Sequence, residues 1–394
     1  MVHRHIRGTR KFVINSEAEF VLDELAGYAA LRDEPNGCEV SCVDRIWEAK
    51  TLLDSKTLSL LNSELQQLRD HQLDGVSRIS DTSTDIIDPF MHCLVYRRTL
   101  AYGSGSGQDL RSEHPPAGIL HDEYTLSRRF VCLATPFRVS PETDCVQLKA
   151  LSYINNVDPS HTALNGYLIS ASATDIKVLP GGPEYRGTPW RIEGMRNEHI
   201  VACAMFCASM VNLTPPCLEF RMSITSPRGI APGDPGATLR TWGLVHHSPC
   251  NQRLGGVTLR PGIAVAYPNI YQHRVTSASL EDPAFEGSMT IISLFLVDPE
   301  LDQDSMDATA LSSTPSTERV PPQQKEWMRR AVEESIDIRI PVEIVEHIIE
   351  MVEGLMTDEE ARMYAKEMRA EREQFWKLHD ERRFCLPFDI WRVL

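Results

Sequence analysis

The chain lacks the features that mark membrane, secreted and nucleic-acid-binding proteins. Its 394 residues contain no run of about 18 apolar residues, the length that a membrane-spanning helix needs. The basic N-terminus is not followed by the apolar segment of a secretory signal. The net charge is −15, from 40 basic and 55 acidic side chains, and an acidic surface repels phosphate backbones. We therefore expect a cytoplasmic protein with no membrane span and no nucleic-acid partner.

The chain also lacks the short motifs of common catalytic and metal sites. It has no nucleophile elbow, no Walker loop, no Cys-x-x-Cys and no His-Glu-x-x-His. Two cysteine pairs are spaced four apart, Cys38/Cys42 and Cys203/Cys207, so a four-cysteine zinc site is one interpretation. Because zinc sites usually have a two-residue gap and no secretory signal is present, we expect reduced, buried thiols instead.

What the chain does have is enough apolar sequence, 42% of its residues, to bury a large core. Apolar residues recur at helical spacing over 41–72, which predicts a helix. From 128 to 300, short segments rich in Val, Ile, Leu, Tyr and Phe alternate with turn residues. This rhythm is typical of an all-β sandwich or jelly roll. The expected strands are 129–134, 146–154, 199–206, 262–267 and 290–297.

The C-terminal part is predicted to be helical again. Thr357-Asp-Glu-Glu360 forms a capping box that starts a helix running to about Leu378. The apolar face of this helix is expected to pack on the β core, with a partner-binding helix as the alternative. That face consists of Tyr364, Met368, Phe375 and Leu378. Residues 103–107 and 301–319 predict mobile loops. The four predicted regions are a helical or irregular part (1–127), the β core (128–300), a loop (301–320) and a helical part (321–394).

Six segments together resemble one family of proteins. They are Ile86–Thr99, Ser152–Pro159, Trp190–Ile200, Tyr267–Val275, Phe295–Pro299 and Val320–Gln324. Their combination is similar to the fungal family catalogued as domain of unknown function 4246, over about residues 80–380. The resemblance implies an α+β protein, in which N-terminal and C-terminal helices pack on a double-stranded β-helix (a cupin-like jelly roll). It also implies a relation to iron(II)/2-oxoglutarate oxygenases and a filamentous-fungal source, where such genes often serve natural-product pathways.

The metal site of such an oxygenase needs two imidazoles and a carboxylate on one face of the iron. By resemblance, Glu193 matches the carboxylate and His273 the distal histidine, but Arg191 stands at the first histidine. A guanidinium stays protonated and cannot ligate a metal. Met289 stands where the family's 2-oxoglutarate-binding arginine would be, and a thioether cannot bind a carboxylate. We therefore expect no metal and no cofactor. The alternative is iron(II) held by Glu193 and His273, together with 2-oxoglutarate.

The Arg-Ile-Glu sequence allows a different chemistry. Arg191 and Glu193 are two residues apart, so in an extended chain their side chains share a face and can form an ion pair. Such a pair keeps Glu193 ionised without iron, and His273 can hydrogen-bond into it. Guanidinium donors polarise carbonyl groups, and a carboxylate–histidine pair can move a proton. We interpret these three residues as catalytic, with a purely structural ion pair as the alternative. The residues expected to line or support the site are His199, Met289, Tyr153, Asn155 and Tyr271.

Three further polar residues are weaker candidates. His199 lies an even six residues after Glu193 and could replace the missing ligand, but a packing or turn role is favoured. Arg221 and Arg274 could hold an acidic cosubstrate. Arg274 should point away from its neighbour on the same strand, His273, and a surface or ion-pair role is expected for Arg221.

Three functions remain open. We favour a cofactor-independent cyclase or isomerase of fungal secondary metabolism, such as a pericyclase that catalyses an intramolecular Diels–Alder reaction on an apolar polyene or terpenoid. Such a reaction needs a shaped apolar cavity and a few hydrogen-bond donors. The second function is an oxygenase with non-standard ligands. The third is a pseudoenzyme that supports an active homologue. A homodimer is compatible with all three.

Overall fold

The computed structural model describes most of the chain. The described residues are 14–35, 37–41, 45–71, 77–78, 80–102, 110–115, 124–139, 146–148, 166–226, 233–299, 320–335 and 341–391. The loops predicted at 103–107 and 301–319 lie outside these residues, as do Cys42, Tyr153 and Asn155. The cysteines that are described, including Cys38, Cys203 and Cys207, are free thiols.

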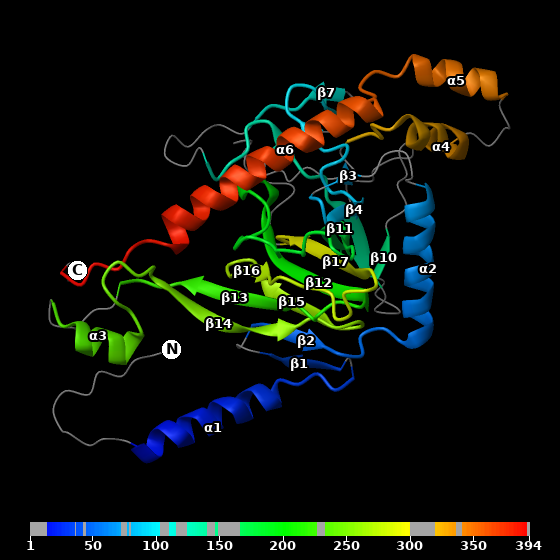
Figure 1. Ribbon diagram of the computed structural model, residues 1–394. Coiled ribbons are helices and arrows are strands. Elements are labelled where there is room, and N and C mark those ends of the chain that lie inside the picture. Colours follow the sequence, from blue (N-terminus) through cyan, green and yellow to red (C-terminus); the bar gives the residue numbers. More distant parts are fainter. Residues whose placement is uncertain are drawn as a thin grey trace.

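Two antiparallel sheets form the body of the molecule (Figure 1). The larger has ten strands in the order β1-β2-β15-β12-β17-β11-β4-β3, with β9 beside β11 and β10 beside β9. These strands are β1 (Cys38–Val40), β2 (Trp47–Ala49), β3 (Ser77–Arg78), β4 (Ser83–Ile87), β9 (Thr135–Val139), β10 (Val146–Leu148), β11 (Gly166–Val178), β12 (Ile200–Val211), β15 (Ala264–Pro268) and β17 (Gly287–Val297). The smaller sheet, in the order β14-β13-β16, consists of β13 (Cys217–Ser223), β14 (Asn251–Thr258) and β16 (Gln272–Val275). Two short pairs join β5 (Leu94–Val95) to β8 (Phe130–Val131) and β6 (Leu100–Tyr102) to β7 (Leu110–Ser112).

The main core forms where alternate side chains of the two sheets meet. On β12, Cys203, Met205 and Cys207 are buried at every second position. On β13, Leu218 and Phe220 alternate in the same way. Both sets belong to a single apolar cluster, so the two sheets share one core. The structure therefore has a mixed helix-and-sheet architecture with mainly antiparallel strand pairing. This confirms the prediction of a β-rich centre with helices around it.

The helix predicted over 41–72 is wrong in its first part. Trp47–Ala49 form strand β2, which pairs with β15 at the edge of the larger sheet. Helix α2 spans only Ser55–His71. It begins there because Asp54 Oδ1 accepts a hydrogen bond from the Thr57 N–H at 2.6 Å, which caps the first turn. Apolar periodicity does not separate a short buried strand from the start of a helix.

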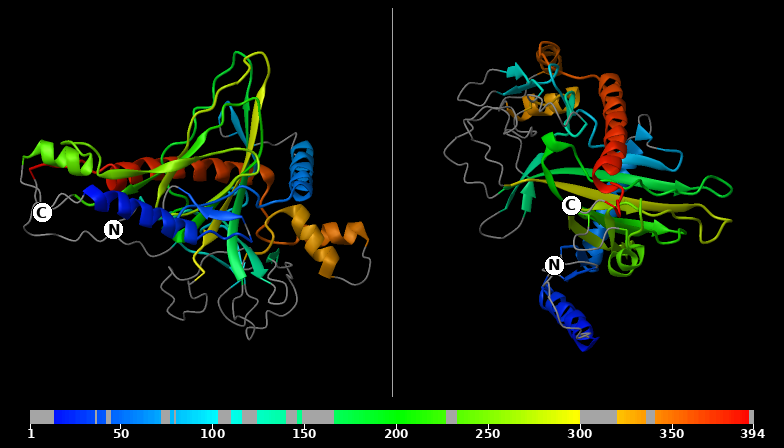
Figure 2. Two further views of the ribbon diagram at one scale, coloured as in Figure 1. Left: turned by 90° about the horizontal axis from the view of Figure 1, so that it is seen from below. Right: turned by 90° about the vertical axis from the view of Figure 1, so that its left-hand side faces the viewer.

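The other helices are α1 (Ile14–Ala30), α3 (Pro235–Trp242), α4 (Lys325–Ser335), α5 (Val342–Glu350) and α6 (Asp358–His379), and a π-helical turn follows at Asp380–Phe384. Figure 1 shows α6 crossing above the sheets, and in both figures α1 lies on the opposite side of the molecule from α4 and α5 (Figure 2). No described helix is long and apolar enough to cross a membrane.

The predicted C-terminal helix is confirmed as α6. Thr357 Oγ1 accepts a hydrogen bond from the Glu360 N–H at 3.2 Å, as a cap should. The Glu360 carboxylate does not return the bond, because it pairs with Arg98 at 2.8 Å between Nε and Oε1. Met368 packs with Phe130 in a separate cluster around β5 and β8, not in the main core. The helix therefore packs part of its apolar face on β5 and β8, of which only β8 lies within the expected β core of residues 128–300.

Candidate active site

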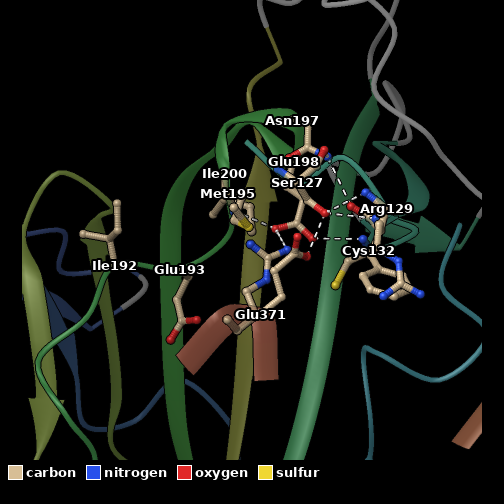
Figure 3. Close-up of polar contacts among 12 residues, drawn as sticks. Ser127, Arg129, Cys132, Ile192, Glu193, Met195, Asn197, Glu198, Ile200 and Glu371 are labelled. Carbon is tan, nitrogen blue, oxygen red and sulfur yellow. Dashed lines mark hydrogen bonds and ion pairs between the residues drawn. The ribbon is translucent and has the colours of Figure 1, made fainter. Parts of the chain in front are cut away.

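The segment that carries Arg191 and Glu193 is tied to β16 by backbone hydrogen bonds at two points. The Arg191 N–H donates to the His273 carbonyl oxygen at 3.1 Å, and the His273 N–H donates to the Arg191 carbonyl oxygen at 2.9 Å. The Thr188 N–H donates to the Val275 carbonyl oxygen at 2.9 Å. These contacts do not make the segment a regular strand of the sheet. The chain is still extended enough for side chains two apart to share a face. Figure 3 shows Ile192 and Glu193 pointing in opposite directions.

Two glycines let this segment approach its neighbours closely. Gly187 has φ of +80°, and a Cβ there would lie 2.3 Å from the Val275 carbonyl oxygen. Gly194 has φ of +70°, and a Cβ there would lie 2.6 Å from Ile200 Cδ1. Both positions combine a left-handed backbone with no room for a side chain, so glycine is required.

Arg191, Glu193 and His273 come together as predicted. Arg191 Nε donates to Glu193 Oε1 at 2.7 Å, and His273 Nε2 lies 3.2 Å from the same oxygen. The His273 side chain is 1% exposed, whereas those of Arg191 and Glu193 are 19% and 11% exposed. The cluster therefore has a closed side at His273 and an accessible side at the ion pair.

Hydrogen-bonding atoms on the accessible side are unused. Nη1 and Nη2 of Arg191 make no hydrogen bond to any residue that the structure describes. Oε2 of Glu193 is likewise without a hydrogen bond within the described ranges, because Oε1 serves both of its partners. The ion pair and the His273 contact therefore leave these donor and acceptor atoms unpaired among the described residues.

Two residues that sequence analysis missed hold the cluster in place. The indole ring of Trp376, on α6, lies 4.9 Å from Arg191 Cζ, and its Nε1–H donates to the Ile192 carbonyl oxygen at 3.1 Å. The Asn269 side chain clamps the backbone of Glu193: its Oδ1 accepts from the N–H at 2.8 Å and its Nδ2 donates to the carbonyl oxygen at 2.7 Å. The only sequence signal for Asn269 was its place in the segment that carries His273.

The electrostatics of the cluster fix its protonation state. Burial alone would raise the pKa of Glu193, but the Arg191 charge and the hydrogen bond from His273 outweigh it and lower the pKa to about 2. Burial lowers the pKa of His273 in spite of its contact with Glu193. At neutral pH, Glu193 is a carboxylate and His273 a neutral imidazole that donates through Nε2–H. Its buried Nδ1 is then an acceptor, and it has no hydrogen-bond partner in the part of the chain that the structure describes.

The described secondary residues lie around the cluster rather than in it. Met289, on β17, and Tyr271 are buried in the main core. His199 has φ of 50° in the turn before β12, and its carbonyl oxygen accepts a hydrogen bond from the Asp298 N–H at 2.9 Å. This placement agrees with the turn role expected for His199.

Arg221 and Arg274 are engaged on the other side of β16. Both guanidinium groups stack on the Trp190 ring, at 4.4 Å and 4.7 Å from its centroid. Arg221 pairs with Asp380, and Arg274 binds a carboxylate on β13. Arg274 thus faces away from His273, as predicted, and the ion-pair role expected for Arg221 is confirmed.

A second polar cluster follows the first along the chain (Figure 3). Glu198 and Arg372 form an ion pair whose side chains are 3% and 1% exposed. Glu198 also accepts hydrogen bonds from the Cys132 N–H at 2.9 Å and the Met195 N–H at 2.8 Å. This cluster joins the N-terminal region, the segment before β12 and helix α6. It fixes the helix that carries Trp376.

The donor set does not fit iron(II) with 2-oxoglutarate. A non-haem iron site of this type uses three protein ligands, and here Glu193 and His273 contact each other while a guanidinium binds the shared oxygen. Within the described ranges, no three His, Cys, Asp or Glu side chains are grouped as a metal site requires. Met289 offers no charge for the far carboxylate of 2-oxoglutarate, and Arg221 and Arg274 are bound elsewhere.

Solved structures show weak similarity to this chain. TqaL, an Fe(II)/(alpha)ketoglutarate-dependent dioxygenase, is 9% identical over 39% of this chain and 48% of its own, with a TM-score of 0.24. A BsmA homologue from Methylobium petroleophilum PM1 is 11% identical over 65% and 89%, with a TM-score of 0.28. AviO1 from Streptomyces viridochromogenes Tue57 is 12% identical over 65% and 91%, with a TM-score of 0.26. The match spans 47% of IDO from Bacillus thuringiensis and 48% of TqaL. Scores this low do not establish a shared fold.

Sequence families give a clearer result. No curated protein matches the chain in sequence. One family model matches residues 15–171 and 168–331, which together cover most of the chain and include all six segments that carry the resemblance. The chain belongs to the family described as "Protein of unknown function (DUF4246)".

Proposed function

We propose that this protein is a cofactor-independent cyclase or isomerase of fungal secondary metabolism that acts on an apolar polyene or terpenoid, on a double-stranded β-helix scaffold related to the oxygenases. The observation that supports the proposal is the pattern of hydrogen bonds at the three nitrogens of the Arg191 guanidinium. Its Nε is bound by Glu193, and its two terminal nitrogens make no hydrogen bond within the part of the chain that the structure describes. The cluster also borders the apolar core, because the His273 ring lies 4.9 Å from that of Tyr267.

Arg191 is suited to bind the carbonyl group of a substrate through Nη1 and Nη2. Hydrogen bonds from a guanidinium withdraw electron density from a conjugated carbonyl and stabilise negative charge that develops on its oxygen. Glu193 and the Trp376 ring hold the guanidinium before a substrate arrives. The donors then need little reorganisation during the reaction. Preorganised donors stabilise the developing negative charge on the carbonyl oxygen most strongly.

Glu193 and His273 are better suited to holding Arg191 than to moving protons. With its pKa lowered to about 2, Glu193 is a weak base. His273 is 1% exposed, and its Nε2 is already engaged with Glu193. A pericyclic ring closure requires no proton transfer, so this arrangement favours that reaction class over an acid–base isomerisation.

A pair of arginine substitutions tests the donor role. Arg191→Met removes the guanidinium and keeps a side chain of similar length. We expect turnover of a polyene that carries a conjugated carbonyl to fall at least about tenfold, on the order of 1.4 kcal/mol of barrier. Arg274→Met is the matched control, because it also removes an arginine that is ion-paired and stacked on tryptophan, but on the other side of β16. Unchanged turnover in Arg191→Met would show that the site is assigned wrongly.

The oxygenase alternative gives a different result in the same preparation. It requires stoichiometric iron in the protein and formation of succinate from 2-oxoglutarate. We expect neither, since the donor set offers two ligands in place of three. Detection of both would overturn the non-redox proposal.

A further inference from the structure

The charges of the Arg191 cluster sum to zero. The guanidinium and the Glu193 carboxylate carry one charge each, and His273 is neutral. The other ionisable groups that interact with the pair are Tyr185, Tyr267 and Cys203. Burial raises the pKa of Tyr185 to about 12 and raises the pKa values of the other two, so all three are uncharged at neutral pH.

We infer that this site takes a neutral hydrogen-bond acceptor, the carbonyl oxygen of a ketone, ester or amide, in preference to a carboxylate, and that Glu193 sets this selectivity. The inference rests on the proposed function in one respect, namely that a ligand binds at Arg191. It goes further because it names the group that the site rejects, a carboxylate, and the residue that sets this selectivity, Glu193.

The first reason is charge. A carboxylate on Nη1 and Nη2 would bring a second negative charge beside Glu193, onto a guanidinium whose charge is already balanced. The Glu193 side chain is 11% exposed, so water screens this repulsion poorly, and the incoming carboxylate would also lose its hydration. A carbonyl oxygen meets no such repulsion and loses much less hydration free energy, because it brings lone pairs without charge.

The second reason is geometry. The strongest arrangement of arginine with a carboxylate is bidentate, with two parallel N–H···O bonds along one edge of the guanidinium. Glu193 already occupies Nε, which removes that nitrogen from any second bidentate pair. The end formed by Nη1 and Nη2 remains, where a carboxylate can bind only end-on and meets the charge of Glu193, whereas one carbonyl oxygen with two lone pairs can accept a hydrogen bond from each nitrogen without that repulsion.

The test compares two probes of nearly equal shape, trans-cinnamamide and trans-cinnamate, by calorimetric titration of the full-length protein at neutral pH. We expect the native protein to bind the amide at least about tenfold more tightly than the carboxylate. Glu193→Gln keeps an oxygen for Arg191 Nε and His273 Nε2 and removes the charge. This substitution should strengthen cinnamate binding about tenfold and leave cinnamamide binding within about twofold.

Glu219→Gln is the matched control, because it removes the carboxylate that pairs with Arg274 on the far side of β16. Both affinities should stay unchanged in it. The inference is overturned if the native protein prefers cinnamate. It is also overturned if a folded Glu193→Gln variant does not gain cinnamate binding. In both cases the proposal that Arg191 binds a hydrogen-bond acceptor still stands. Should Glu193→Gln fail to fold, the preference of the native protein decides the question alone. Absence of binding by either probe, or binding that survives Arg191→Met, overturns the acceptor site itself.

Discussion

At the scale of single residues, the proposed function depends on the Arg191 guanidinium, which is bound at one nitrogen and, among the described residues, has no hydrogen bond at the other two. An isolated arginine at the edge of an apolar core would be costly, because its charge would be poorly hydrated. Glu193 balances that charge, and the Trp376 ring covers one face of the guanidinium. The contacts that offset the free-energy cost of placing Arg191 here also fix the direction of its Nη1–H and Nη2–H donors.

Trp376 provides the first prediction. Trp376→Ala removes both the ring beside Arg191 and the hydrogen bond to the Ile192 carbonyl oxygen. We expect turnover to fall about tenfold, because the guanidinium loses its fixed orientation. Trp376→Phe keeps an aromatic ring and should retain most of the activity. Steady-state rates on both variants, with circular dichroism to confirm folding, make the comparison. Equal losses in the two variants would contradict an orienting role for the ring.

The three central residues were predictable because their relation is local or carried by a motif. Arg191 and Glu193 share a face through their two-residue spacing, and His273 lies in a segment of family resemblance. Trp376 was not predictable in this way, since it lies 184 positions from Ile192 and meets it only because α6 crosses the site. No periodicity in the sequence encodes where a helix crosses a sheet.

Helix α6 is the element on which the site depends most. Its arginines bind buried carboxylates from two regions, and its Trp376 covers the site. Arg369 bonds Asp85 at 3.1 Å and Asp88 at 2.5 Å, both near the end of β4. Arg372 pairs with Glu198 just before β12. The helix thus ties the N-terminal region to the segment that carries the site.

The contact between α6 and β4 predicts a pH dependence of stability. Burial, with the nearby Asp88 charge, raises the pKa of Asp85 to about 6 although Thr174 and Arg369 oppose this. In the unfolded chain, the pKa of an aspartate is about 4. The folded protein therefore binds more protons between these values, and its stability should fall as pH rises through this window. Asp85→Asn should remove that component. Urea unfolding at several pH values measures it, and identical pH dependence in both proteins would contradict the assignment.

Helix α2 provides a separate prediction. Arg69 binds Asp175 on β11 through two bonds, of 2.5 Å and 2.8 Å. Arg69→Met leaves the buried Asp175 without this partner, so the free energy of unfolding should fall by on the order of 2–3 kcal/mol. Arg329→Met breaks an ion pair with Glu346, whose side chain is 31% exposed against 9% for Asp175, and should have a much smaller effect. Equal effects of the two substitutions in chemical denaturation would refute the prediction.

At the scale of the whole molecule, the alternating apolar segments between 128 and 300 predicted the β-rich centre. The pairing register and the assignment of each strand to one of the two sheets could not be predicted, because they depend on contacts between distant strands. The short strand β2 was mistaken for helix for the same reason, since its partner β15 is far away in sequence. Family membership covers residues 15–331 and agrees with the segments chosen for the resemblance. The apolar substrate, the homodimer and the cytoplasmic location stay predictions.

The proposed function requires that Arg191 promotes ring closure without iron or 2-oxoglutarate. Its most direct test is product formation from a carbonyl-bearing polyene by chelator-treated, oxygen-free protein, measured for the native chain and for Arg191→Met. We predict that chelation and removal of oxygen leave the native rate unchanged, while Arg191→Met lowers it at least about tenfold. Product that forms only when iron(II), 2-oxoglutarate and oxygen are supplied, with succinate released, would contradict the account.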